Sequence, residues 1–200
     1  MSLDIIFYVG YDGKLVSLLK LIESMRNWKV PRLKLVKYNG YCRGKQCSPE
    51  EAFQKILQRD LYTRFRIEVS FQEKLDGKYQ LDYSISVWPR VLVGLGGYRA
   101  SDFLVDKSLQ RSIRELAVGI GKDLSQHYVL YTCDQGLLSN NIFNIILEGK
   151  ANIDDILDMI KKEGNLFDIK FLKNDFNNLV YYETISKYKI IKDSMLNKLV

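Results

Sequence analysis

The sequence predicts an α+β (mixed α/β) fold, in which helices pack on one face of a sheet that is built around a central antiparallel hairpin and opens with a β-α-β unit. Three observations predict it. The first forty residues switch between strand-like and helix-like apolar spacing, residues 64–88 alternate apolar and polar side chains, and residues 109–124 follow helical spacing. With 200 residues, 46% of them apolar, the chain can bury one continuous core. We expect one compact domain over 1–200, with a core in 1–150 and a C-terminal α/β extension in 151–200 packed on it.

The opening β-α-β unit is read from the first apolar runs. Residues 4–9 form a short apolar run typical of a strand, and residues 14–25 place leucine and isoleucine at helical spacing. Pro31 prevents the helix from continuing, and the alternation over 33–38 predicts a half-exposed strand.

The next helix carries the clearest start signal in the chain. Ser48 is placed as the N-cap, Pro49 occupies the first helical position, and Glu51 closes a capping box. The apolar residues that follow, as far as Leu61, are expected on the buried face of this helix.

The hairpin over 64–88 can be registered from its own pattern. A two-residue loop would mix the two faces, whereas a three-residue loop, Leu75–Gly77, makes one face wholly apolar. That register pairs Phe71 with Leu81, Val69 with Tyr83, Ile67 with Ile85 and Phe65 with Val87. The opposite face carries Arg64, Arg66, Glu68, Ser84 and Ser86, so it either contacts water or meets a polar partner.

Later elements are expected in the following order. A strand over 91–95 leads into Gly94–Gly97, which we interpret as a tight turn because the dinucleotide-binding glycine pattern is incomplete. An amphipathic helix over 109–124 ends near Gly121 and packs on the sheet. Further elements are a buried strand over 127–133, two short helices after Ser139 and Asn152, the second stopping at Gly164, a strand over 166–172, and a strand or helix over 179–191.

The composition excludes several classes of protein. The longest apolar runs are far shorter than the roughly 20 residues of a membrane-spanning helix, so no membrane is expected as a partner. Three cysteines are an odd number, and the first residues do not resemble a secretory signal, so we expect no disulfide framework. These features favour a reducing compartment and predict a cytoplasmic location.

The most informative feature is an uneven distribution of positive charge. Residues 20–66 sum to +8, although the whole chain carries only +6. Between Arg26 and Lys45 there are seven basic residues and no acidic one, interleaved with aromatic side chains. Such a surface attracts phosphates and can stack bases. The candidate anion-binding or nucleic-acid-binding residues are Arg26, Lys29, Arg32, Lys34, Lys37, Tyr38, Tyr41, Arg43, Lys45, Ser48, Arg64 and Arg66. The simpler alternative is a solvated strand edge, on which lysines discourage aggregation.

The segment Cys42–Cys47 precedes the capped helix, where free backbone N–H groups could hold a phosphate with help from Gly44, Lys45 and Ser48. Its spacing is not that of a P-loop, and a zinc site would need further cysteine or histidine ligands. We therefore predict no metal, no cofactor and no catalytic residue.

The leading hypothesis is a non-enzymatic binding protein whose basic, aromatic-interleaved N-terminal segment contacts an anionic partner, most plausibly nucleic acid. The alternative is a protein-interaction module of the immunity or inhibitor type that covers an acidic surface of a partner. The third hypothesis is an enzyme that acts on a phosphorylated or nucleotide substrate through the loop over 43–48, although the sequence names no general base for it. The oligomeric state does not follow from the sequence.

Overall fold

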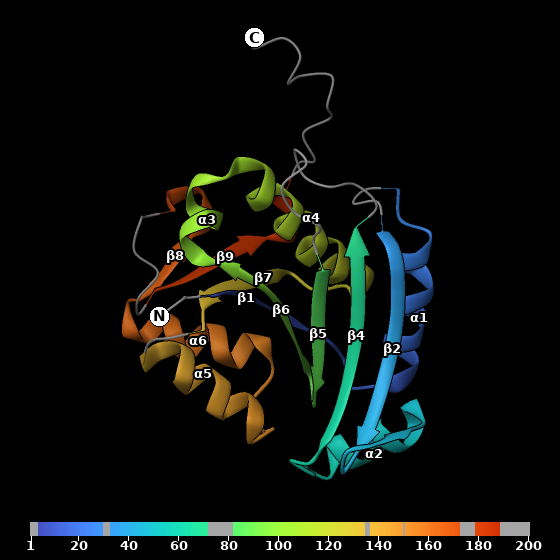
Figure 1. Cartoon of the computed structure of the whole chain (residues 1–200). Helices are drawn as coiled ribbons and strands as arrows, with labels where there is room; N and C mark the ends of the chain where they lie inside the picture. The colour runs from blue at the N-terminus through green and yellow to red at the C-terminus, as the bar shows by residue number, and fades with distance from the viewer. Residues whose placement is uncertain are drawn as a thin grey trace.

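The computed structural model describes residues 4–29, 33–71, 82–134, 137–149, 151–172 and 179–188. These residues form an α+β fold (Figure 1), which confirms the predicted class. In chain order the elements are β1 (Asp4–Gly10), α1 (Leu15–Arg26), β2 (Leu33–Cys42), β3 (Lys45–Cys47), α2 (Pro49–Leu57), β4 (Thr63–Phe71), β5 (Asp82–Trp88), β6 (Val91–Arg99), α3 (Ala100–Val105), α4 (Lys107–Asp123), β7 (Tyr128–Cys133), α5 (Leu137–Leu147), α6 (Ile153–Glu163), β8 (Leu166–Asp168) and β9 (Val180–Thr184), with 3-10 turns at Ile169–Phe171 and Ile185–Lys187.

The strands form one sheet in the order β3-β2-β4-β5-β6-β1-β7-β9-β8. Every neighbouring pair is antiparallel except β8 and β9. Strands β1 and β2 are separated by β4, β5 and β6, and four antiparallel steps make them run parallel. The opening β-α-β unit is therefore present, with three later strands inserted between its two strands.

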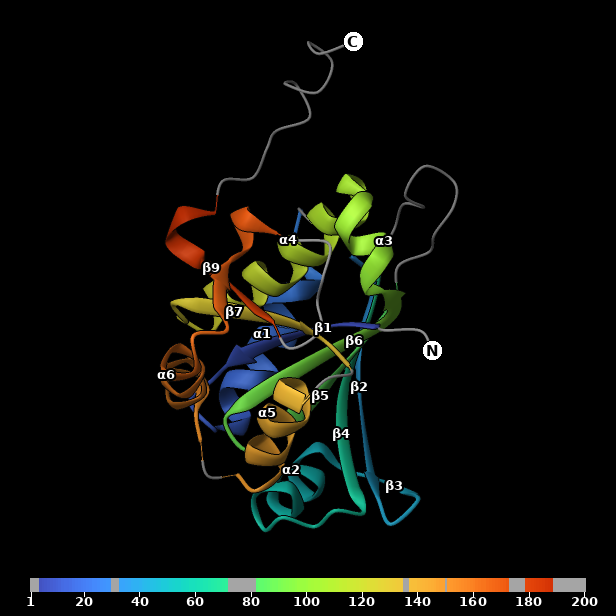
Figure 2. The same ribbon diagram turned by 90° about the vertical axis from the view of Figure 1, so that its left-hand side faces the viewer.

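Helices cover both faces of the sheet, so the expectation that they pack on one face is wrong. Leu18 of α1, Phe53 of α2, Phe103 of α3 and Ile113 of α4 belong to one core cluster. Helices α5 and α6 contribute to a second cluster around Ile6 and Tyr8 of β1. Figure 1 shows β1, β7 and β9 running between α3 and α4 on one side and α5 and α6 on the other, and Figure 2 shows the same arrangement turned by 90°. The physical reason is that β1 is apolar at every position from 5 to 9, so both of its faces require cover.

The predicted hairpin register is present in the described part of β4 and β5. Ile67 lies opposite Ile85 and Val69 lies opposite Tyr83. All four side chains are buried, which agrees with the apolar face that selected this register. The loop at 75–77 and the pairing of Phe71 with Leu81 lie outside the described residues.

The tight turn predicted at Gly94–Gly97 is wrong, because this segment continues β6. A Cβ atom added to Gly94 would lie 2.1 Å from Cζ of Phe7, so the glycine is required for close packing between neighbouring strands. Gly97 adopts φ +64° where the pairing register of β6 with β1 shifts, as expected for a glycine in a bulge.

The C-terminal third departs from expectation mainly in element length. The strand expected over 166–172 ends at Asp168 and continues as a 3-10 turn, while residues 180–184 form a strand. The helix expected after Ser139 begins at Leu137. Helix α6 has the predicted boundaries, because Asn152 forms a capping box and Gly164 is left-handed at the C-cap.

Candidate anion-binding surface

Among the described residues, β2, β4 and most of β5 contribute nothing to the second core cluster on the face opposite the first core cluster; Trp88, at the end of β5, contacts α5 through the ring of Phe143. The strand registers place Lys37, Glu68 and Ser84 in one row across these strands, and Asn39, Arg66 and Ser86 in the next row. Tyr41 and Arg64 are paired at the following position on the same side. We call this surface the open face, and it comprises Lys37, Asn39, Tyr41, Arg64, Arg66, Glu68, Ser84 and Ser86, of which Ser84 has a buried Oγ atom. The second core cluster begins only at the edge of this surface, with Trp88, Val91 and Val93.

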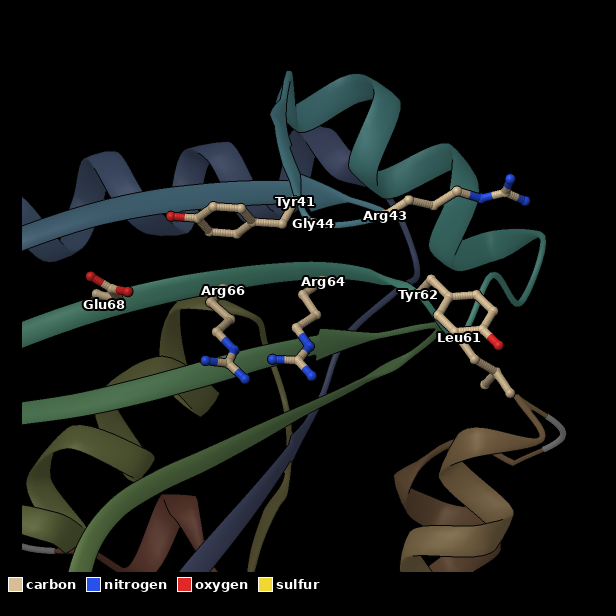
Figure 3. Close-up of a pocket in the computed structure, with 8 residues that line it drawn as sticks. All are labelled: Tyr41, Arg43, Gly44, Leu61, Tyr62, Arg64, Arg66 and Glu68. Atoms are coloured by element: carbon tan, nitrogen blue, oxygen red, sulfur yellow. The ribbon is translucent and has the colours of Figure 1, made fainter.

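A hollow of about 920 Å³ lies over one end of the open face (Figure 3). Its lining residues are Tyr41, Arg43, Gly44, Leu61, Tyr62, Arg64, Arg66 and Glu68. Figure 3 shows the side chains of Arg64 and Arg66 extending in the same direction from β4, toward β5. Arg43 points away from them, beyond the end of the hairpin.

Charge pairing separates the basic residues of the open face into two kinds. The Nζ atom of Lys37 lies 3.2 Å from a carboxylate oxygen of Glu68, so this lysine is neutralised locally. Within the described part of the chain, neither Arg64 nor Arg66 forms an ion pair with a carboxylate. Two guanidinium groups are thus available to an anion from outside, beside the ring of Tyr41, which is 41% exposed.

The turn between α2 and β4 supplies two residues that the sequence analysis did not identify as site residues. Helix α2 ends at Leu57, so Leu61 does not lie on its buried face as expected, and Leu61 and Tyr62 are 69% and 75% exposed. The Asp60 carboxylate accepts hydrogen bonds from the Tyr62 backbone N–H and the Thr63 hydroxyl, at 3.0 Å each. The bond from Tyr62 is the main cause that lowers the pKa of Asp60. The sequence does contain a signal for this turn, because an aspartate at position 60, shortly after the end of α2, favours an Asx turn.

The segment 42–47 is a closed hairpin, and Cys42 and Cys47 are joined by a disulfide. The expectation that the cysteines do not pair is therefore wrong for these two. Arg43 and Gly44 both have positive φ, at 51° and 78°, which is the backbone of a tight two-residue turn. This turn reverses the chain and leaves the Cα atoms of the two cysteines 5.9 Å apart, within the usual range for a disulfide. Cys133 is buried and does not belong to this disulfide.

The structure brings together five of the twelve predicted site residues. Lys37, Tyr41, Arg64 and Arg66 belong to the open face, and Arg43 lies at the end of the hollow.

Five other predicted residues lie elsewhere. Nε of Arg26 donates to the carbonyl of Val36 at 3.3 Å, and Lys29 lines a groove beside α4. Tyr38 lies on the opposite face of β2, edge-on to Phe65, and Lys45 pairs with Cys42. The Ser48 hydroxyl accepts from the Glu51 backbone N–H at 3.1 Å, so it caps α2 as predicted and is already engaged.

Two predicted residues remain, Lys34 and Arg32. Lys34 is exposed where the pairing of β2 with β4 is irregular, and Arg32 lies outside the described residues. The predicted site residues are dispersed because alternate residues of a strand point to opposite faces of the sheet, so a run of basic residues is divided between the two faces.

In the described residues, no helix is long and apolar enough to cross a membrane. Comparisons of the chain with protein-family models, with curated proteins and with solved structures found no match.

Proposed function

We propose that the protein binds single-stranded nucleic acid on the open face. The observation that supports this proposal is that Arg64 and Arg66, which form no ion pair with a carboxylate of the described residues, lie beside the exposed ring of Tyr41. Their positions two residues apart on one strand separate their Cα atoms by about 7 Å, which allows each guanidinium to meet a separate phosphate. A guanidinium binds phosphate through two parallel hydrogen bonds, and an exposed tyrosine ring can stack on a base.

Exposed aromatic rings on the open face and beside it favour a single strand over a duplex. The bases of a single strand are free to lie on aromatic rings, whereas those of a duplex are stacked on each other. The exposed Tyr62 and the cationic Arg43 extend the surface beyond the end of β4 and could accommodate further nucleotides.

The experiment is a fluorescence anisotropy titration of labelled single-stranded DNA and RNA, and of the matching duplexes, across a salt series. We expect Arg64→Ala/Arg66→Ala to weaken single-strand binding by about tenfold per arginine. We also expect the slope of log K against log salt to become shallower by about 1.4, since two phosphate contacts are removed from a single strand.

The matched control is Arg26→Ala/Lys29→Ala, which removes the same charge from the basic segment but not from the open face. This control should leave most of the affinity and most of the salt slope in place. Equal losses of affinity in the two double variants would show that the interaction is general charge attraction. Absence of binding at low salt would contradict the proposal.

One observation favours a second candidate function, the binding of a protein with an acidic surface. Leu61 and Tyr62 are exposed beside Arg43 and Arg59, and together they line a second hollow of about 610 Å³. Tyrosine and arginine are enriched among the residues that dominate protein interfaces. A stoichiometric complex with such a protein that persists after nuclease treatment, and that the Tyr62→Ala variant does not form, would favour this function. The enzyme hypothesis has no comparable support, because its loop is a closed hairpin.

A further inference from the structure

Three metal-ligating groups converge at the base of the β2–β3 hairpin. The sulfur atoms of Cys42 and Cys47 and a carboxylate oxygen of Glu51 all lie within 4.8 Å of one another. They come from three consecutive elements, since Cys42 ends β2, Cys47 ends β3 and Glu51 lies in the first turn of α2. Glu51 is not among the residues predicted from the sequence, because only cysteine and histidine were expected as zinc ligands.

The local structure holds these groups in place. The tight turn at Arg43 and Gly44 fixes the hairpin, and the Ser48 cap with Pro49 fixes the start of α2. Cys42 is 7% exposed, Cys47 is partly exposed and Glu51 is exposed, so the cluster opens to solvent on one side.

We propose that the cysteine pair is a reversible redox couple, and that its reduced form, together with Glu51, binds a thiophilic divalent cation such as Zn²⁺. Tetrahedral zinc lies about 2.3 Å from each thiolate sulfur, which requires the two sulfurs to be about 3.8 Å apart. Rotation of the two side chains after reduction provides this separation from a Cα distance of 5.9 Å. The carboxylate is the third ligand and a water molecule the fourth.

The redox step balances with a thiol such as glutathione as the reductant. A glutathione thiolate attacks the more exposed sulfur, that of Cys47, which breaks the S–S bond and releases the Cys42 thiolate. A second glutathione attacks the mixed disulfide, releases the Cys47 thiolate and leaves oxidised glutathione, so two electrons pass to the protein. Zn²⁺ then binds the two thiolates, and any thiol protons pass to the buffer.

The cation must compete with one existing interaction. The Nζ atom of Lys55 lies 2.7 Å from the Glu51 carboxylate, and a bound divalent cation would take over that oxygen. Oxidation abolishes the site because a disulfide offers no thiolate ligand. This proposal does not rest on nucleic-acid binding, so either can fail without the other.

The test uses the whole 200-residue chain, reduced and then freed of reductant, and titrated anaerobically with Co²⁺ as a spectroscopic probe. We expect one Co²⁺ per chain, a thiolate-to-cobalt charge-transfer band, and loss of that band when Zn²⁺ is added. The band should be absent from the oxidised protein and from Cys47→Ser. Glu51→Gln should weaken Co²⁺ binding at least tenfold, whereas Glu50→Gln, the matched change at the neighbouring exposed carboxylate, should not.

Three results would overturn the proposal. One is a reduced wild-type protein without a charge-transfer band, and another is equal affinity of Glu51→Gln and Glu50→Gln for Co²⁺. The third is a disulfide that remains closed in millimolar reduced glutathione while the protein stays folded, which mass spectrometry after thiol alkylation measures. Circular dichroism of each variant shows whether loss of binding is separate from loss of folding.

Discussion

A buried ion pair joins α4 to β9, and its removal gives the sharpest stability prediction. Arg114 donates to both carboxylate oxygens of Glu183, one of them at 3.0 Å, and the Tyr131 hydroxyl donates to Glu183 at 3.0 Å. The Glu183 side chain is 6% exposed and that of Arg114 is 26% exposed. Burial opposes the charge of Arg114, but the hydrogen bonds to Glu183 and the negative charge of that carboxylate together outweigh burial and raise the pKa of the guanidinium.

We expect Arg114→Met to lower the free energy of unfolding by about 3 kcal/mol. Breaking a buried pair leaves an uncompensated carboxylate, typically at a cost of about 3 to 5 kcal/mol, and the partial exposure of Arg114 favours the lower end of that range. In a domain of this size, that loss corresponds to a decrease in Tm of about 6 to 12 °C. Urea unfolding of the wild type and the variant measures the free energy directly.

The double variant Arg114→Met/Glu183→Gln tests the physical reasoning. Because it removes both charges, it should be more stable than the sum of the single variants predicts, by about 2 kcal/mol. The control is Arg111→Met on the same helix, whose pair with Glu115 is longer at 4.0 Å and which should cost less than about 1 kcal/mol. Additive single variants, or an Arg114→Met effect no larger than that of Arg111→Met, would refute the argument that an unpaired buried charge dominates.

Three further predictions concern packing, capping and pH. Gly94→Ala should lower the free energy of unfolding by about 1 to 3 kcal/mol, because its new Cβ meets the Phe7 ring. The double variant Gly94→Ala/Phe7→Leu should regain part of this loss, as measured by urea unfolding. Asn152→Ala removes the capping box of α6 and should cost about 1 kcal/mol by the same assay, whereas no change would show that the cap is replaced by water. Burial raises the pKa of Tyr83 and Tyr131 well above 10, so their stabilising contribution is complete below about pH 10 and is lost as the pH rises further. Ultraviolet absorbance should then show tyrosines that ionise only on alkaline unfolding, and ordinary titration of every tyrosine in the folded state would contradict this.

Local signals in the sequence predicted the elements that depend on local chemistry. The start of α2 follows from Ser48 and Pro49, and both ends of α6 follow from Asn152 and Gly164. The register of β4 with β5 also follows from sequence, because a shift by one residue would expose every apolar side chain of the hairpin.

Features that depend on non-local contacts were not predictable in the same way. Gly94 was interpreted as a turn residue because nothing in the sequence shows that Phe7, far away in the chain, packs against it. The basic segment was treated as one surface, although strand alternation and the tight turn divide it between two faces and the hairpin tip. The disulfide required knowledge that Arg43 and Gly44 form a tight turn, which a glycine-containing pair indicated only weakly.

The apolar pattern of each strand shows where the sheet lacks a cover, and this links the sequence to the candidate site. Strands β1 and β7 are apolar at nearly every position and are buried on both faces, with helices on either side. Strand β4 alternates, so only one of its faces can be stabilised by burial. Its polar face could have been satisfied by neutral or paired side chains, as Lys37 and Glu68 show. Arg64 and Arg66 form no ion pair with a carboxylate of the described residues, so their like charges repel each other on this face, and the proposed binding of an anion would remove that repulsion.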